Sequence, residues 1–196
     1  MITKLSVSIV NRLLSNGYLA AADKEEISYG LFSILSKAFF FIVCMLLGVF
    51  FRVPLESGIF YFSFLLIKKY AGGFHASTES KCLIISSLSI LFSIVVIKEI
   101  IILSVIQIPF SVITLVSAVI VCLFSPVEAK EKPLTGTEKK KFHCFTIFRV
   151  LILFIFTISL MVLNKPRIYI PIETGLFLEG VYLTAGEIKR RKNVHF

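Results

Sequence analysis

The sequence predicts an all-α membrane protein with about six transmembrane helices and an N-terminal amphipathic helix at the membrane interface. Hydrophobic residues make up 57% of the 196 residues and the mean hydropathy is +0.91, well above the values of soluble domains. These residues also gather in long runs between short polar segments, which is typical of membrane-spanning helices. The length suits a single integral membrane domain over residues 1–196.

Residues 1–30 form the predicted cytoplasmic N-terminal region. Apolar residues recur there at helical spacing: Ile2, Leu5, Ile9 and Leu13. A helix with one such apolar face and a polar remainder lies in the membrane interface. The pattern ends near Asn16-Gly17, a typical stop signal for a helix.

Six apolar runs follow and provide the predicted spans. They cover about 31–51, 54–67, 82–97, 100–124, 145–163 and 168–185. The second and third runs are short for a crossing of about 20 residues. Lys98-Glu99, between the third and fourth runs, is either a tight external turn or a polar interruption of one longer helix.

The basic residues predict the orientation of these spans. The formal net charge is +9, and 16 of the 21 Lys and Arg residues fall on the side that holds both termini, against four on the other. Basic residues favour the cytoplasmic side of a membrane. We therefore expect a multi-pass cell-membrane protein whose termini, 68–81 loop and 126–144 loop are cytoplasmic. This distribution explains the charge without a nucleic-acid partner.

No cofactor or metal ion is predicted. The four cysteines show neither a CxxC pair nor a regular spacing of the kind that holds zinc or forms a disulfide framework. No GxxxxGK[ST] phosphate-binding loop occurs in the sequence. We therefore expect a function that does not require hydrolysis of ATP by this chain.

The stretch KKYAGGFHASTESKC at 68–82 holds the candidate catalytic pair, His75 and Cys82. Seven residues of straight helix would separate the two by about 10 Å, so the loop must fold back to bring them together. Gly72-Gly73 frees the backbone for such a reversal. From spacing alone, a lone His–Cys pair in a loop is more often incidental than catalytic.

The position of Cys82 favours a nucleophile. It stands at the start of an apolar run, with Thr78 or Ser80 as the helix N-cap and Lys81 adjacent. The positive end of a helix favours the thiolate, which is the nucleophilic form. His75 would then act as base and acid. The candidate orienting groups are two loop carboxylates, Glu79 and Glu128.

These residues resemble the signature of the accessory gene regulator B (AgrB) family, membrane endopeptidases of Gram-positive peptide quorum sensing. A second segment, SPVEAKEKPL at 125–134, is similar to the family's Pro-Val-Glu…Pro-Leu loop. The resemblance implies that Cys82 is the nucleophile and His75 its partner. It also implies an AgrD-like precursor peptide as substrate, whose tail is removed through a thioester before the rest closes to a thiolactone or lactone.

The roles of several other polar residues stay open. Lys68 and Lys69 stand where arginine is expected in many relatives, and lysine binds a substrate carboxylate less well than a bidentate guanidinium, so this role is left open. Arg149 either extends to the interface or binds the substrate tail. Glu173 and Glu179 either line a polar path for the peptide or pair with Arg or Lys near the helix ends.

Two other functions fit the composition. One is a small peptide exporter or channel without proteolytic activity, in which Gly72-Gly73 is a hinge and the His–Cys pair is incidental. The other is a non-enzymatic membrane interaction protein. We also expect a homodimer, because a six-span chain this short forms only a small cavity.

Overall fold

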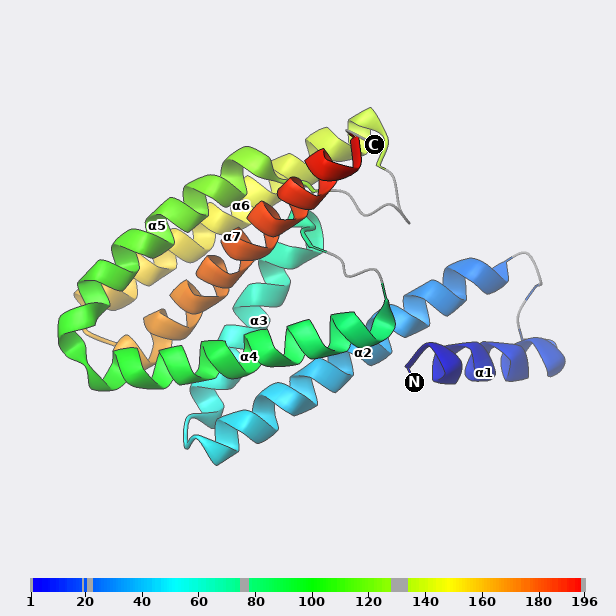
Figure 1. Cartoon of the computed structure of the whole chain (residues 1–196), viewed down its shortest axis with the longest axis horizontal. Coiled ribbons are helices and arrows are strands. Elements are labelled where there is room, and N and C mark those ends of the chain that lie inside the picture. The colour runs from blue at the N-terminus through cyan, green and yellow to red at the C-terminus, as the bar shows by residue number, and fades with distance from the viewer. Residues whose placement is uncertain (1, 19, 21–22, 75–77, 128–133, 195–196) are drawn as a thin grey trace. The chain divides into compact units, whose positions relative to one another are not determined.

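The computed structural model describes residues 2–18, 20, 23–74, 78–127 and 134–194. Seven α-helices make up most of this part of the chain, in which there is no strand (Figure 1). They are α1 (Ile2–Ser15), α2 (Lys24–Phe50), α3 (Pro54–Ala71), α4 (Glu79–Ile102), α5 (Gln107–Phe124), α6 (Gly136–Val162) and α7 (Pro166–Val194), with a short 3₁₀ helix, η2 (Ser104–Ile106), before α5. The predicted all-α class is confirmed. The chain divides into two compact units, Met1–Val43 and Cys44–Phe196.

Four helical segments, rather than about six, are long and apolar enough to cross a membrane. These are Lys24–Phe50, Glu79–Ile102, Ser104–Phe124 and Gly136–Val162. The predicted count of about six is therefore not matched. The two predicted spans at 54–67 and 168–185 do lie in helices. However, α3 carries Glu56, Lys68 and Lys69 within 18 residues, and α7 is the least apolar of the long helices.

Two predicted span boundaries differ from the ends of the helices. Lys98 and Glu99 lie inside α4, which continues to Ile102, so of the two alternatives a polar interruption within a helix fits the structure and a tight turn at these residues does not. The fifth predicted span began at 145, whereas α6 begins at Gly136. Its start is fixed by a capping box, in which the Thr135 hydroxyl accepts a hydrogen bond from the Glu138 backbone N–H at 3.3 Å and the Glu138 carboxylate accepts one from the Thr135 N–H at 2.9 Å.

Helix α7 is central within the second unit. It packs most extensively against α3 and α5, and also contacts α4 and α6 (Figure 1). Most of its residues between 169 and 187 are buried. One core cluster joins Leu176 and Leu183 of α7 to Ile67, Val121 and Val150 of three neighbouring helices.

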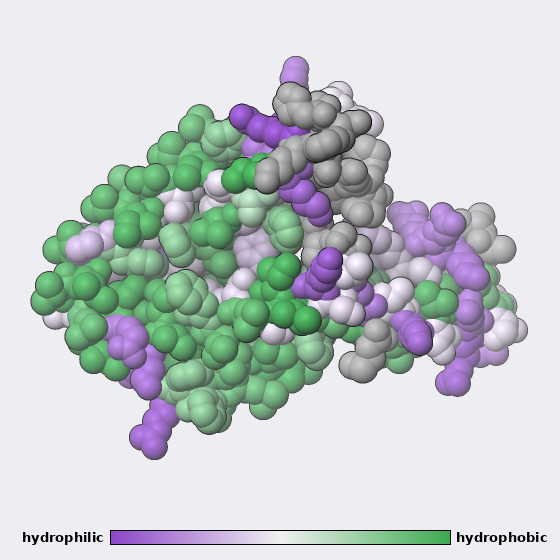
Figure 2. Space-filling view, in the orientation of Figure 1, coloured by the Kyte–Doolittle hydropathy of each residue, from purple (hydrophilic) through white to green (hydrophobic). Residues whose placement is uncertain are grey.

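The other long helices turn apolar side chains outward. Leu88 of α4 is 59% exposed, Val116 of α5 is 57% exposed and Ile155 of α6 is 64% exposed. Figure 2 shows hydrophobic residues covering the visible face over α4 and α5. An apolar surface of this extent is compatible with a lipid environment. The apolar helices and their exposed faces support the predicted membrane protein.

Candidate active site

Cys82 lies in the first turn of α4. The Thr78 hydroxyl caps this helix by accepting a hydrogen bond from the Lys81 backbone N–H at 3.3 Å, so Thr78, and not Ser80, is the N-cap. The Cys82 N–H donates to the Thr78 carbonyl at 3.0 Å, which closes the first turn. Cys82 is a free cysteine and is half-buried. The thiol therefore sits at the positive end of a helix, as expected.

His75 and Glu128 lie outside the described residues, so their predicted roles beside Cys82 stay predictions. Glu79, the other candidate orienting carboxylate, is the first residue of α4. It shares the first turn with Cys82, and the two residues are three positions apart. On a helix, side chains at this spacing are neighbours.

The two signature segments are hydrogen-bonded to each other. Gly72 and Val127 form an isolated parallel bridge, in which the Val127 N–H donates to the Ala71 carbonyl at 2.9 Å and the Gly73 N–H donates to the Val127 carbonyl at 3.3 Å. Gly72 has φ = +77°, and a Cβ added to it would lie 2.1 Å from the Val127 carbonyl oxygen. Only glycine fits this position.

The C-terminal part of α7 supports the same segment from another side. The Phe74 N–H donates to the Tyr182 carbonyl at 3.0 Å. A Cβ added to Gly186 would lie 2.9 Å from the Gly73 carbonyl carbon, so α7 packs directly on this backbone. We call Gly72, Gly73, Phe74, Val127, Tyr182 and Gly186 the loop seat. It holds the chain immediately before His75 and, through Val127, immediately before Glu128.

The sequence did not identify the α7 residues of the loop seat. Tyr182 contributes a backbone carbonyl, and any residue type could supply one. Gly186 was a weak signal, because a glycine inside a helical pattern indicates close packing without naming the partner.

His143 of α6 supports the second signature segment. Its Nδ1 lies 2.7 Å from the Ser125 carbonyl oxygen. A carbonyl can only accept, so Nδ1–H is the donor. The contact fixes the chain two residues before Val127. The neighbouring Cys144 is a free, exposed cysteine.

Comparison with known proteins identifies the family. The family model described as accessory gene regulator B matches residues 6–183. The chain belongs to the AgrB family. It is 29% identical over 148 residues to "Putative AgrB-like protein 2" of Clostridium perfringens (strain 13 / Type A), covering 72% of this chain and 68% of the relative. It is 28% identical over 149 residues to "Putative AgrB-like protein" of C. perfringens (strain SM101 / Type A), with the same coverage. No solved structure matches the chain.

Membership of the AgrB family has three consequences. It supports a role in the accessory gene regulator system of quorum sensing. It implies a role with the AgrD peptide in a membrane setting, in agreement with the apolar helices. The family is linked to peptide processing. A half-buried thiol such as that of Cys82 is a chemical group that such processing can use.

The two lysines that open the AgrB-like signature lie in different environments. Lys68 is half-buried, and its Nζ lies 4.0 Å from the ring centroid of Tyr182 and 4.9 Å from that of Phe64. Lys69 is exposed, with its Nζ 5.3 Å from the ring centroid of Tyr70. A cation over an aromatic face is attracted by the ring. Lys68 is therefore directed at α7, and Lys69 is not.

Arg149 of α6 is bound to the end of α3. Its Nη1 donates to the Leu66 carbonyl at 2.5 Å, and its Cζ lies 4.3 Å from the ring centroid of Tyr70. These contacts account for Arg149 without a substrate. Neither predicted role, extension to the interface or binding of the substrate tail, is needed to explain its position.

A salt-bridge cluster lies close to the loop seat, on the last turns of α7. Arg190 donates to the Glu187 carboxylate at 2.8 and 2.9 Å, and Arg191 donates at 2.9 Å. The two hydrogen bonds from Arg190, with the one from Arg191, lower the pKa of Glu187 to about 2. Lys189 on the same turn lies with its Nζ 5.2 Å from the ring centroid of Phe74.

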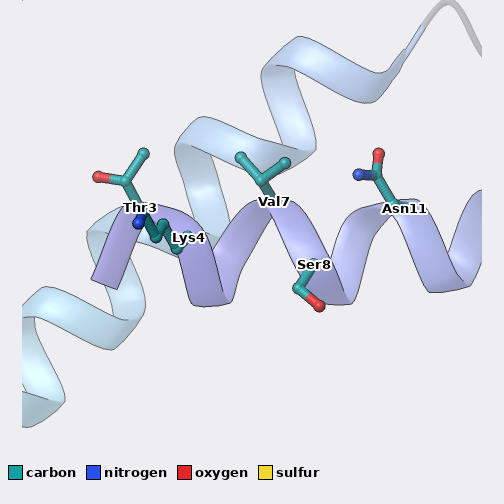
Figure 3. Close-up of a pocket in the computed structure, with 5 residues that line it drawn as sticks. All are labelled: Thr3, Lys4, Val7, Ser8 and Asn11. Atoms are coloured by element: carbon teal, nitrogen blue, oxygen red, sulfur yellow. The ribbon is translucent and has the colours of Figure 1, made fainter. Parts of the chain in front are cut away.

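A surface hollow of about 430 Å³ lies on α1, away from these residues in the sequence. It is lined by Thr3, Lys4, Val7, Ser8 and Asn11 (Figure 3). None of these is a candidate nucleophile, acid or base of the predicted site. Among the residues that the structure describes, no three His, Cys, Asp or Glu side chains are grouped to hold a metal ion.

Proposed function

We propose that this chain is a membrane cysteine endopeptidase that removes the C-terminal tail of an AgrD-like precursor and promotes cyclisation of the remainder. The main support is the loop seat. Two signature segments that are far apart in the sequence are joined by the Gly72–Val127 bridge. The residues that follow the bridge, Gly73 in one segment and Glu128 in the other, are both predicted site residues. Family membership and the position of Cys82 at the α4 N-terminus add to this.

The first step is cleavage. His75 takes the proton of the Cys82 thiol, and the thiolate attacks the carbonyl carbon that precedes the tail. The carbon–nitrogen bond then breaks, the proton passes from His75 to the departing amine, and the tail leaves. The remaining peptide is held on Cys82 as a thioester. In this scheme the first turn of α4 stabilises the thiolate.

The second step is ring closure. An internal Cys or Ser of the precursor attacks the thioester carbonyl, the bond to the Cys82 sulfur breaks, and a thiolactone or lactone forms. The proton lost by the attacking group returns to Cys82, which regenerates the enzyme. Exchange of one thioester for another is nearly balanced in free energy, so the step needs no ATP. Water must be excluded from the thioester, and a site against apolar helices favours this.

The site would face the cytoplasm. The 68–81 and 126–144 segments and the C-terminal turns of α7 are rich in lysine and arginine, and basic residues favour the cytoplasmic side of a membrane. An amphipathic precursor on the cytoplasmic leaflet would meet Cys82 there. Both termini would lie on the same side.

The test is an assay in liposomes with an AgrD-like precursor, following tail release and ring mass by mass spectrometry. We expect tail release by the wild type, and its loss in both Cys82→Ala and His75→Ala. A covalent peptide adduct should form only when Cys82 is present. Unchanged tail release by Cys82→Ala would contradict the proposal. Export of an uncleaved peptide by that variant would favour the exporter without proteolytic activity.

A further inference from the structure

Helix α6 contacts both signature segments, and His143 makes its contact with the second one. The His143 Nδ1–H donates to the Ser125 carbonyl at 2.7 Å. Thr146 and Val150 follow His143 at helical spacing and are buried, so His143 belongs to the buried face of α6. Ser125 is 6% exposed, and its N–H donates to the Val121 carbonyl at 3.1 Å. A buried carbonyl needs a hydrogen-bond partner, and the imidazole supplies one.

The same turns of α6 contact the first signature segment through Tyr70. The Tyr70 ring centroid lies 5.2 Å from that of Phe142, in an edge-to-face contact, and 5.2 Å from that of Phe145. The Arg149 guanidinium lies over the same ring and donates to the Leu66 carbonyl. The N-terminal half of α6 therefore holds the end of α3 as well as the second segment.

The bridge between the two segments lies next to both of these attachments. The Val127 N–H donates to the Ala71 carbonyl at 2.9 Å, and the Gly73 N–H donates to the Val127 carbonyl at 3.3 Å. Tyr70 directly precedes Ala71, and Ser125 precedes Val127 by two residues. Because α6 holds Tyr70 in one segment and Ser125 in the other, it keeps the two backbones within hydrogen-bonding distance.

We propose that His143 is a positioning residue for the loop seat, and that its Nδ1–H maintains the Gly72–Val127 bridge by holding the Ser125 carbonyl. The inference deepens the proposed peptidase function and rests on it for the effect on tail release. From the bridge, the chain continues to Glu128 in one segment and, two residues after Gly73, to His75 in the other. His143 acts on these predicted site residues through the backbone, without contacting the substrate.

The required chemical feature is a hydrogen-bond donor on the atom next to Cγ. Asparagine carries its amide nitrogen at the place of Nδ1, whereas glutamine carries it further out, at the place of Nε2. An asparagine amide donates a hydrogen bond but does not take up a proton near neutral pH. Asparagine therefore replaces His143 in a positioning role and does not replace it in an acid–base role.

The first test measures tail release in liposomes by full-length variants. In His143→Leu, which removes the donor, kcat should fall about ten- to hundredfold, with KM within about twofold of the wild-type value. His143→Asn should keep most of the wild-type kcat, and His143→Gln should resemble His143→Leu. Cys144→Ala is the matched control, because it changes the exposed neighbour of His143 and should leave kcat unchanged. If His143→Leu does not fold, the comparison of His143→Asn with His143→Gln makes the same test.

The second test is amide hydrogen exchange of the same proteoliposomes, read by mass spectrometry. It does not depend on activity. The Gly73 and Val127 N–H groups are the donors of the bridge, so peptides that contain them should exchange about tenfold faster in His143→Leu. His143→Asn should restore slow exchange. Peptides from the middle of α7, around the buried Leu176, should exchange as in the wild type, which separates a local displacement from general unfolding.

Two results would overturn the inference. One is loss of tail release in both His143→Leu and His143→Asn with unchanged exchange at the bridge, because this would make His143 an acid–base or substrate-binding group. The other is wild-type tail release and wild-type exchange in His143→Leu, because the hydrogen bond would then position nothing. If the wild type releases no tail, the proposed function fails, and the exchange rates still decide whether His143 maintains the bridge.

Discussion

Helix α7 and the four apolar helical segments show opposite relations between polarity and burial. Helix α7 carries Glu173, Glu179 and Glu187 and has the lowest apolar character of the long helices, yet most of its middle is buried. The apolar segments in α2, α4, α5 and α6 have few buried residues and expose Leu, Ile, Val and Phe. In a bilayer, the outer surface must be apolar, and polar groups are best placed where other helices can satisfy them.

This difference explains where the support of the candidate site comes from. The loop seat is built against α7, through the Tyr182 carbonyl and the close packing of Gly186. Cys82 lies on α4, one of the apolar segments, at its polar end. The apolar helices face lipid, and one of them, α4, carries the thiol at its N-terminal end. The central helix, α7, fixes the backbone of the loop seat.

A charge on an apolar helix should have the largest effect. Val116 lies in the middle of α5 and is 57% exposed, so Val116→Asp would place a carboxylate against lipid. We expect this to cost about 3 kcal/mol of insertion free energy. The fraction of protein that resists alkaline extraction from membranes measures it.

Val116→Ala is the control for that substitution, since it removes the same methyl groups without adding a charge. It should remain in the membrane fraction. If Val116→Asp were inserted as well as the wild type, α5 would not face lipid, and the contrast with α7 would be lost.

A methyl group on the central helix should have an intermediate effect. Gly186→Ala places a Cβ 2.9 Å from the Gly73 carbonyl carbon and 3.0 Å from the Phe74 N, so backbone must move. We expect a loss of about 1–3 kcal/mol in the free energy of unfolding, and a fall in tail release through displacement of the loop seat. Chemical denaturation and the liposome assay measure the two effects.

Gly30→Ala on α2 is the matched comparison. A Cβ added there meets nothing within 4 Å, and alanine is the better helix former by about 1 kcal/mol. It should be neutral or stabilising. Equal effects at positions 30 and 186 would contradict the close packing of α7 on the loop seat.

The fold class and the helices could be predicted because long hydrophobic runs are visible in the order of the residues along the chain. The count of spans could not, because α3 and α7 are helices whose acidic residues Glu56, Glu173 and Glu179 are buried in the protein. Lys98-Glu99 left two alternatives open in the sequence, and the structure fits the polar interruption within a helix, since both charges lie inside α4. The apolar run that predicts the fifth span starts at 145, whereas α6 starts earlier, at the capping box of Thr135 and Glu138.

The candidate site was predictable where it depends on local sequence. The adjacent residues predict Cys82 at a helix start and a cap at Thr78 or Ser80, and the structure shows that helix start with Thr78 as its cap. Gly72 and Gly73 have the positive φ angles that glycine favours. Contacts between distant segments could not be read in this way. The Gly72–Val127 bridge, Gly186 against Gly73, and Arg149 on the Leu66 carbonyl depend on how the helices pack.

Replacement of Glu187, near the C-terminal end of α7, by a neutral residue should have the smallest effect on stability. Glu187 is hydrogen-bonded by Arg190 and Arg191, but these guanidinium groups are 62% and 68% exposed, so solvent weakens the attraction. We expect Glu187→Gln to cost about 0.5 kcal/mol near neutral pH.

The pKa of Glu187 is lowered to about 2, below the usual value of about 4.3 for an unfolded chain. A lowered pKa stabilises the folded state above the unfolded value, and this contribution is lost as the pH falls toward 2. The difference in unfolding midpoint between wild type and Glu187→Gln should therefore shrink between about pH 4.5 and pH 2. A difference that stays constant over this range would show that Glu187 acts through packing, like the buried middle of α7, and not through its charge.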